Sequence, residues 1–242
     1  MPPGPRGSQG PGGPHRTHVL TGAGSGIGAA VAERLQARGD HLVLLARDEA
    51  RAEDLAATHP GADVVALDLA DPAAVEAWRP PEGLDGVDSL LHVAGYVELG
   101  PVATTDRAVW ERTLHVNVTA PALLTGTLLP ALRARRGTVV FVNSGAGINA
   151  HAQWGAYAAS KFALRALADA LRAEEAPHGV RVSTVFPGRT ATPMQAQVHA
   201  QEGADYDPGA WTAAGTVADT ILACVDLPGD AALAEVVLRP GP

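Results

Sequence analysis

The stretch H-V-L-T-G-A-G-S-G-I-G at residues 18–28 decides the fold, because a short apolar run passes there into a glycine-rich turn and then into a helical pattern. Such a turn lets backbone N–H groups and the helix N-terminus approach a pyrophosphate, where the partial positive charge of the helix end meets the anion. The glycine spacing is G-x-x-x-G-x-G and not the commoner G-x-G-x-x-G. Because glycine-rich strand–helix turns also occur without a ligand, the turn alone leaves a nucleotide site and a plain flexible turn as alternatives.

Outside this stretch, short apolar runs alternate with longer helical patterns. Several runs are almost continuous in Val and Leu, as expected for parallel strands covered on both faces. The alternation predicts an α/β fold, a single-domain Rossmann-like, doubly wound parallel sheet of seven strands flanked by helices. Strands are expected at residues 18–21, 41–46, 63–67, 89–93, 138–143, 181–186 and 235–238. Helices are expected at residues 28–38, 49–58, 72–78, 106–135, 156–178 and 216–225.

The domain boundaries follow from composition. Residues 1–15 are dense in Pro and Gly, which cannot hold a helix or bury a core, so we expect a disordered tail. This stretch also lacks the apolar segment of a secretory signal. Residues 16–242 are expected to form one domain. Residues 193–215 are the least regular part of it and follow the sixth strand, where a substrate lid is expected.

The overall composition argues against several classes of partner. The formal net charge is -8 and no Lys/Arg cluster is present, so neither nucleic acid nor an anionic membrane surface is an expected partner. No apolar run reaches the roughly 18 residues that a membrane span needs. Cys224 is the only cysteine, which rules out an intrachain disulfide and fits a cytoplasmic location. No metal site is expected.

A tyrosine and a lysine four residues apart, Tyr157 and Lys161, stand on one face of the helix expected at residues 156–178. Ser144 directly follows a strand, at the carboxyl edge where open α/β sheets bind ligands. The Y-x-x-x-K spacing alone is also typical of an amphipathic helix with a solvated lysine. Together with the glycine turn and Ser144, it points to a proton-transfer centre.

In this order and spacing, the motifs resemble those of the short-chain dehydrogenase/reductase family, in its branch of about the length of this 242-residue chain. The resemblance covers residues 17–240. The matching motifs are T-G-x-x-x-G-I-G at residues 21–28, Asp68-Leu69, Ala94-Gly95, Asn117 within L-H-V-N-V, Ser144, Y-x-x-x-K at residues 157–161 and P-G-x-x-x-T at residues 187–192.

The resemblance implies hydride transfer between a nicotinamide and a carbonyl or alcohol carbon, with Tyr157 as general acid and base. A free tyrosine has a pKa near 10, and a nearby ammonium favours the phenolate, so we expect Lys161 to lower the pKa of Tyr157. Ser144 would stabilise the developing charge on the substrate oxygen. By resemblance, Lys161 also holds the nicotinamide ribose and Asn117 orients a water relay to Lys161. The alternative for Asn117 is a local hydrogen bond inside its helix.

The expected cofactor contacts follow the same motifs. They are Gly22, Ser25, Gly26, Ile27, Gly28, Arg47, Asp68, Leu69, Ala94, Gly95, Tyr157, Lys161, Pro187, Gly188, Thr190 and Thr192. Asp68 is also explained as a cap before the next helix and Thr192 as a loop hydroxyl, because such residues favour caps and turns.

Arg47 predicts the form of the cofactor. Dinucleotide folds that bind NAD place an acid at the end of the second strand, roughly 20 positions beyond the glycines. Here that strand ends in Ala46, and Arg47 can make a charge-assisted fork with a 2′-phosphate. Asp48 is interpreted as the N-cap of the next helix. We therefore expect NADP(H) to be preferred, with NAD(H) possible. Ser25 stands where some relatives carry a second basic residue, so the expected preference for NADP(H) is moderate. The alternative interpretation of Arg47 is a solvated loop residue that does not contact the cofactor.

One departure concerns the sheet. The family usually has N-N-A-G where this chain has H-V-A-G at residues 92–95. We interpret His92 as structural and not catalytic, because it lies at the adenosine end, away from Tyr157. The departure affects hydrogen bonding at the sheet edge and not the reaction.

The substrate pocket is expected to include Ser144, Ala146, Trp154 and Tyr157, which indicates a modest apolar pocket. Further candidates flank them in sequence: Tyr96, Ile148, His151 and Gln153. Arg189 would bind an acidic substrate or, as exposed arginines usually do, point into solvent.

The sequence thus predicts an NADP(H)-dependent oxidoreductase that acts on a small carbonyl or alcohol. The alternatives are a non-enzymatic NADP(H)-binding sensor of the same fold and an NAD(H)-preferring alcohol dehydrogenase. A sugar-nucleotide epimerase would carry a further substrate domain, which is not expected here. The resemblance also implies a homodimer or homotetramer formed through helices 106–135 and 156–178.

Overall fold

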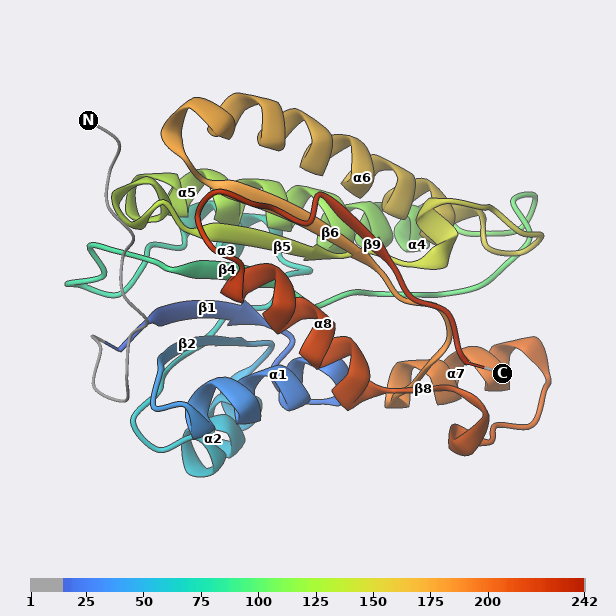
Figure 1. Cartoon of the computed structure of the whole chain (residues 1–242). Coiled ribbons are helices and arrows are strands. Elements are labelled where there is room, and N and C mark those ends of the chain that lie inside the picture. The colour runs from blue at the N-terminus through green and yellow to red at the C-terminus, as the bar shows by residue number, and fades with distance from the viewer. Residues whose placement is uncertain (1–14, 242) are drawn as a thin grey trace.

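The computed structural model describes residues 15–241, so the expected tail lies outside the described residues except for His15. The seven expected strands form one parallel sheet in the order β3-β2-β1-β4-β5-β6-β9, which confirms the predicted fold (Figure 1). The strands are β1 (Thr17–Thr21), β2 (His41–Ala46), β3 (Asp63–Ala66), β4 (Ser89–His92), β5 (Thr138–Val142), β6 (Arg181–Phe186) and β9 (Glu235–Val237). The order reverses between β1 and β4, where ligands bind in sheets of this kind.

Helices cover both faces of this sheet (Figure 1). One face carries α1 (Gly26–Ala37), α2 (Glu49–Thr58) and α8 (Ala214–Asp226); the other carries α3 (Pro72–Ala77), α4 (Arg107–Leu114), α5 (Ala120–Arg135) and α6 (Gly155–Glu175). Alternate strand residues divide between two apolar cores: Val19 packs toward α3, α5 and α6, and Leu20 toward α1, α2 and α8. Burial on both faces explains why the strands are continuous in Val and Leu.

The helix expected at residues 106–135 is interrupted. A π-helix, His115–Thr119, joins α4 to α5 and contains Asn117. The apolar pattern continues through L-H-V-N-V, so the periodicity gave no sign of the interruption. Such single-turn widenings occur frequently at functional sites.

The expected lid is also more regular than its sequence indicated. Residues 193–215 contain α7 (Pro193–Glu202), a 3₁₀ turn (Pro208–Ala210) and β8 (Thr212–Ala213), which pairs with β7 (Thr190–Ala191). The Thr192 hydroxyl caps α7 by accepting from the Gln195 amide at 3.2 Å, and Pro193 occupies the first turn. Gly203 ends the helix at φ +67°.

Other helix boundaries agree with the sequence within three residues; the largest difference is at α6, whose last expected residues, Ala176–His178, form a 3₁₀ turn. Asp48 is the N-cap of α2, as expected, and its carboxylate accepts from the Arg51 amide at 2.9 Å. None of the helices in the described part of the chain is both long and apolar enough to cross a membrane.

Candidate active site

A cavity of about 840 Å³ lies along the carboxyl edge of the sheet and runs from the glycine turn to Tyr157. The turn is held against the loop after β4. The Thr21 hydroxyl accepts from the amides of Val93 and Ala94 at 3.1 and 3.2 Å. Gly22 has φ +80°, and a Cβ there would stand 2.7 Å from the Ala94 nitrogen. Only glycine permits this close approach, so the turn and the Ala94-Gly95 segment form one wall.

The N-terminus of α1 opens into this cavity. Ser25 is its N-cap in extended conformation, and its side chain makes no capping hydrogen bond. Gly24 has only the Arg51 side chain near its missing Cβ, at 4.0 Å, so the backbone is accessible there. A twelve-residue helix with an open first turn fits the pyrophosphate of a dinucleotide. Gly26 does not line the cavity. It has φ +55°, and a Cβ there would stand 3.0 Å from the Thr192 methyl group.

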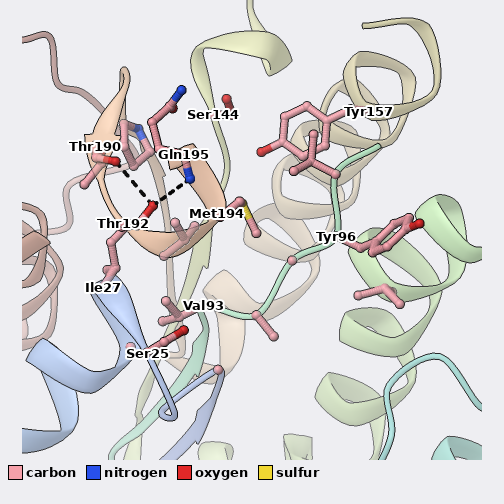
Figure 2. A pocket seen from close by; sticks show the side chains of 18 of the residues that line it. Ser25, Ile27, Val93, Tyr96, Ser144, Tyr157, Thr190, Thr192, Met194 and Gln195 are labelled. Atoms are coloured by element: carbon pink, nitrogen blue, oxygen red, sulfur yellow. Dashed lines mark hydrogen bonds between the residues drawn. The ribbon is translucent and has the colours of Figure 1, made fainter. Parts of the chain in front are cut away.

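At the other end of the cavity, Tyr157 and Lys161 are buried on α6, with 7% and 3% of their surfaces exposed. Lys161 Nζ lies 5.6 Å from the centre of the Tyr157 ring and donates to the Val142 carbonyl at 3.0 Å. Ser144 lies opposite them at the end of β5, and its Oγ accepts from the Ala146 amide at 3.1 Å. Figure 2 shows the Tyr157 hydroxyl pointing into the pocket on the side of Ser144.

Burial controls the pKa values of this pair. Desolvation raises the pKa of Tyr157 to about 12, and a hydrogen bond with Ser144 opposes the rise. Desolvation lowers the pKa of Lys161 from 10.5 to about 8. The expected lowering of the Tyr157 pKa by Lys161 is therefore wrong for the chain alone, because desolvation outweighs the opposing hydrogen bond with Ser144. At neutral pH, Tyr157 holds its proton and Lys161 is charged.

Asn117 lies beneath the cavity and not in its wall. Its Oδ1 accepts from the Tyr96 amide at 2.8 Å, and its Nδ2 donates to the Tyr96 carbonyl at 2.8 Å and to Ser160 Oγ at 2.9 Å. Both amide hydrogens are thus engaged by the protein. The side chain joins the loop after β4 to helix α6, so Asn117 positions the helix that carries Tyr157 and Lys161.

The adenosine end of the cavity is exposed and charged. Arg47 follows β2 with 67% of its side chain exposed, and its Nε contacts the Asp48 carboxylate at 3.2 Å. Two hydrogen bonds hold the pKa of Asp48 below its usual range: the larger effect comes from the Arg51 backbone amide and the smaller from the Arg47 side chain. Asp68 lines the same end and caps its own turn by accepting from the Ala70 amide at 2.9 Å.

The segment after β6 closes the cavity on the side of α7. Pro187, Gly188, Thr190 and Thr192 all line it. The Thr192 hydroxyl donates to the Thr190 carbonyl at 3.2 Å while it caps α7, which fixes its position (Figure 2).

The expected substrate residues are partly brought together. The cavity wall contains Ala146 and Trp154, and the Trp154 ring meets the Tyr157 ring edge-on at 5.8 Å. Tyr96 and His151 also line the wall, whereas Ile148 and Gln153 do not. Arg189 is not free to bind a substrate, because its guanidinium makes two bonds of 2.8 Å to the Glu202 carboxylate.

His92 has the structural place expected for it. Its Nε2 lies 2.9 Å from the Thr125 hydroxyl of α5, and its ring stacks on Phe141 at 5.0 Å. Burial lowers the pKa of His92 to about 3, so the ring is neutral. The side chain therefore ties β4, in the middle of the sheet and not at its edge, to α5.

Of the expected catalytic and cofactor-binding residues, all but Gly26 and Asn117 lie in the cavity wall. The wall also contains charged and flexible residues that sequence reasoning missed: Arg51, Arg112, Met194, Gln195, Glu202 and Arg239. Arg51 lies one helical turn after Arg47, so its spacing could have revealed it. Arg239 lies near the C-terminal end of the sequence, and no motif there indicated that it lines the cavity. Residues 15–241 contain no cluster of His, Cys, Asp and Glu able to hold a metal ion.

Comparison with known proteins agrees with this geometry. The family model of the short chain dehydrogenases matches residues 16–203. The human protein named dehydrogenase/reductase SDR family member 2, mitochondrial, is 35% identical over 195 residues, which cover 78% of this chain and 70% of that protein. The bovine dehydrogenase/reductase SDR family member 7B is 36% identical over 201 residues, and the match covers 78% of this chain but only 62% of that longer protein.

Among solved structures, a metagenomic short-chain oxidoreductase in complex with NADP has a TM-score of 0.75 and 31% identity, with 94% of this chain and 97% of that chain covered. The fold and the cavity define a dinucleotide-binding oxidoreductase of the dehydrogenase/reductase class. The chain belongs to the short-chain dehydrogenase/reductase family.

Proposed function

We propose that the protein is an NADP(H)-dependent oxidoreductase that interconverts a ketone or aldehyde and an alcohol, with Tyr157 as general acid and base. One observation carries the proposal: Tyr157, Lys161 and Ser144 share a cavity with an open helix N-terminus. When bound, the nicotinamide supplies or accepts the hydride.

In the direction of reduction, Tyr157 donates its proton to the carbonyl oxygen. Burial keeps the pKa of Tyr157 at about 12, so the proton is present at neutral pH. The Ser144 hydroxyl donates a hydrogen bond to the same oxygen and stabilises its developing charge. Lys161 supplies positive charge beside the resulting phenolate, which favours its formation.

Asn117 belongs to this proposal as a positioning residue. Its side chain holds Tyr96 and Ser160, three residues after Tyr157 on the same helix. The water relay to Lys161 that the family resemblance implies would run through the main chain of the π-helix, because the Asn117 amide hydrogens are engaged.

The preference for NADP(H) over NAD(H) rests on Arg47 after β2, where the strand ends in Ala46 and not in an acid. Arg51 adds a second guanidinium to the same end of the cavity. The NADP found with the similar metagenomic oxidoreductase supports this choice. The remaining assigned contacts, from Gly22, Ser25, Ile27, Gly28, Asp68, Leu69, Ala94, Gly95 and residues 187–192, would line the bound dinucleotide.

The test is absorbance of the reduced nicotinamide during incubation with a panel of ketones, aldehydes and alcohols. We expect turnover with NADPH that exceeds turnover with NADH. Binding of NADP⁺ without turnover of any panel member would favour the non-enzymatic sensor, and equal or better efficiency with NADH would refute the cofactor assignment.

We also propose a homodimer or homotetramer. Leu114 of α4 and Phe162 of α6 are 38% and 42% exposed, and these two helices pack side by side. A symmetric interface there would bury both side chains. Light scattering that shows a monomer at micromolar concentration would contradict this. A cytoplasmic location remains our proposal on the ground of the single cysteine, Cys224, and cell fractionation tests it.

A further inference from the structure

The charge of the cavity wall is opposite to the charge of the chain. The whole chain has 26 Asp and Glu against 18 Lys and Arg. The wall contains Asp68 and Glu202 against six cations, Arg47, Arg51, Arg112, Lys161, Arg189 and Arg239. A cleft lined by one sign of charge concentrates ions of the other sign, so this cavity favours anions.

Most of these cations already have a role or a partner. Arg47 and Arg51 lie at the adenosine end, where the cofactor brings its own phosphate. Lys161 is at the proton-transfer centre, and Arg189 is neutralised by Glu202 at 2.8 Å. Arg112 stacks over the Tyr96 ring at 4.7 Å.

Arg239 is the cation that remains, and it lies at the catalytic end. Its Nη1 is 3.6 Å from the place that a Cβ on Gly145 would occupy, and Gly145 directly follows Ser144. Its only hydrogen bond among residues 15–241 is to the Leu238 carbonyl at 3.0 Å, and no carboxylate of those residues pairs with it. Within the described part of the chain, this exposed guanidinium therefore has no carboxylate partner, and it borders the end of the cavity that contains Ser144.

The backbone that carries Arg239 is held in place. Leu238 donates to the Phe186 carbonyl at 3.0 Å, and the Leu238 carbonyl accepts from the Gly188 amide at 2.9 Å. Pro240 follows and keeps residue 239 in an extended conformation. The segment is therefore fixed to the Pro187-Gly188 loop, which forms part of the wall.

We propose that Arg239 binds a carboxylate of the substrate, so that the enzyme acts on oxo acids and hydroxy acids. This inference rests on the proposed function and names the substrate class of the same site. A guanidinium presents parallel N–H donors that match a carboxylate. The Arg239 guanidinium lies beside Gly145, the neighbour of Ser144, and both Arg239 and Ser144 line the cavity that contains Tyr157. A single unpaired guanidinium fits a monoanion better than a phosphate dianion.

The first test measures binding. Isothermal titration calorimetry on the protein saturated with NADP⁺ compares levulinate, its homologues longer by one and two carbons, and their methyl esters. We expect the best acid to bind about tenfold more tightly than its ester, the ratio that roughly 1.4 kcal/mol of charge-assisted hydrogen bonding gives. In Arg239→Gln the ratio should fall to near one, and in Arg239→Lys it should be intermediate, because lysine keeps the charge without the fork.

Arg165→Gln is the matched control. It also removes one positive charge beside β9, since Arg165 pairs with Glu235 at 2.7 Å, but Arg165 lies outside the cavity wall. The acid-to-ester ratio should survive this change. If it fell as in Arg239→Gln, the effect would come from net charge or from β9 itself, and the assignment to Arg239 would be wrong.

The second test measures kcat/KM for the same pairs with NADPH, where the acid-to-ester ratio should again depend on Arg239. Equal binding and equal kcat/KM of acid and ester in the wild type would overturn the inference while leaving the proposed function intact. Failure to bind NADP⁺, or absence of turnover of acids and esters alike, would count against the proposed function instead. Tighter binding of hydroxyacetone phosphate than of every oxo acid would overturn the choice of a carboxylate.

Discussion

The two ends of the cavity are built on different physical principles. At the catalytic end, Tyr157 and Lys161 are 7% and 3% exposed, and desolvation moves their pKa values. At the adenosine end, the side chains of Arg47 and Arg51 are 67% and 53% exposed, so water and salt screen their charges. At the buried end, one side chain, Tyr157, is therefore expected to perform the proton transfer. At the exposed end, selectivity for the cofactor is expected from the sum of several weak contacts.

The strongest test of this difference is Tyr157→Phe. Removing the hydroxyl should lower kcat by about 10²–10⁴-fold, because the general acid that transfers its proton to the substrate oxygen is lost, whereas Ser144 only donates a hydrogen bond. The dissociation constant of NADP⁺, measured by fluorescence, should stay within about twofold. Tyr206→Phe makes the same chemical change outside the cavity wall and should keep kcat within a few-fold. A Tyr157→Phe enzyme with near wild-type turnover would remove Tyr157 from the reaction.

At the exposed end, the expected effects are smaller and cumulative. Arg47→Ala and Arg51→Ala should each lower the ratio of kcat/KM for NADPH to that for NADH by about three- to tenfold, and the double variant by roughly 10–100-fold. Raising the salt concentration should reduce the wild-type ratio, because both groups are screened. Arg107→Ala, at a surface pair with Glu111 outside the wall, is the control. An unchanged ratio in the double variant would contradict this account.

The buried end should also respond to pH. Lys161 has its pKa lowered to about 8, so its ammonium is present below that pH and lost above it. In the direction of reduction, the pH dependence of kcat/KM for NADPH reports the pKa values of groups in the free enzyme. This kcat/KM should be level below pH 8 and fall by up to about tenfold per unit above it. A plateau that extends beyond pH 10 would show that Lys161 stays charged and that its desolvation is compensated.

A further expected effect concerns the stability of the fold, at a buried histidine of β4. Burial lowers the pKa of His92 from 6.5 to about 3. Between these values the unfolded chain binds a proton that the folded chain does not, so stability decreases as the pH falls, by about 1.4 kcal/mol per unit from this residue. His92→Asn should remove this part of the slope in urea unfolding measured between pH 6.5 and 4. An unchanged slope would mean that His92 is hydrated in the folded chain.

The sheet could be predicted from the sequence because parallel strands that are buried on both faces consist of nearly continuous runs of Val and Leu. The sequence predicted most of the wall because the motif residues stand at strand ends, which all meet at one edge. It did not predict the π-helix at Asn117, since a change in backbone hydrogen bonding leaves the apolar pattern intact. Helix α7 was missed although its Thr192-Pro193 start and Gly203 end were visible.

The environments of two charged side chains, Arg189 and Arg239, could not be predicted from the sequence for a different reason. The pairing of Arg189 with Glu202 and the approach of Arg239 to Gly145 depend on how distant segments meet. The direction of the Tyr157 pKa shift depends on burial, which the Y-x-x-x-K spacing does not contain. Sequence patterns thus identify the groups, and packing decides which of them are free to act.

The contact between Thr21 and the amides of Val93 and Ala94 has a consequence for folding kinetics. It joins residues that are 72 and 73 positions apart, so one wall of the nucleotide site exists only after β4 has docked beside β1. Pairings of such long range form slowly. NADP⁺ should therefore slow unfolding of the completed domain without accelerating the early steps of refolding, because it has no complete surface to bind until the central strands have met.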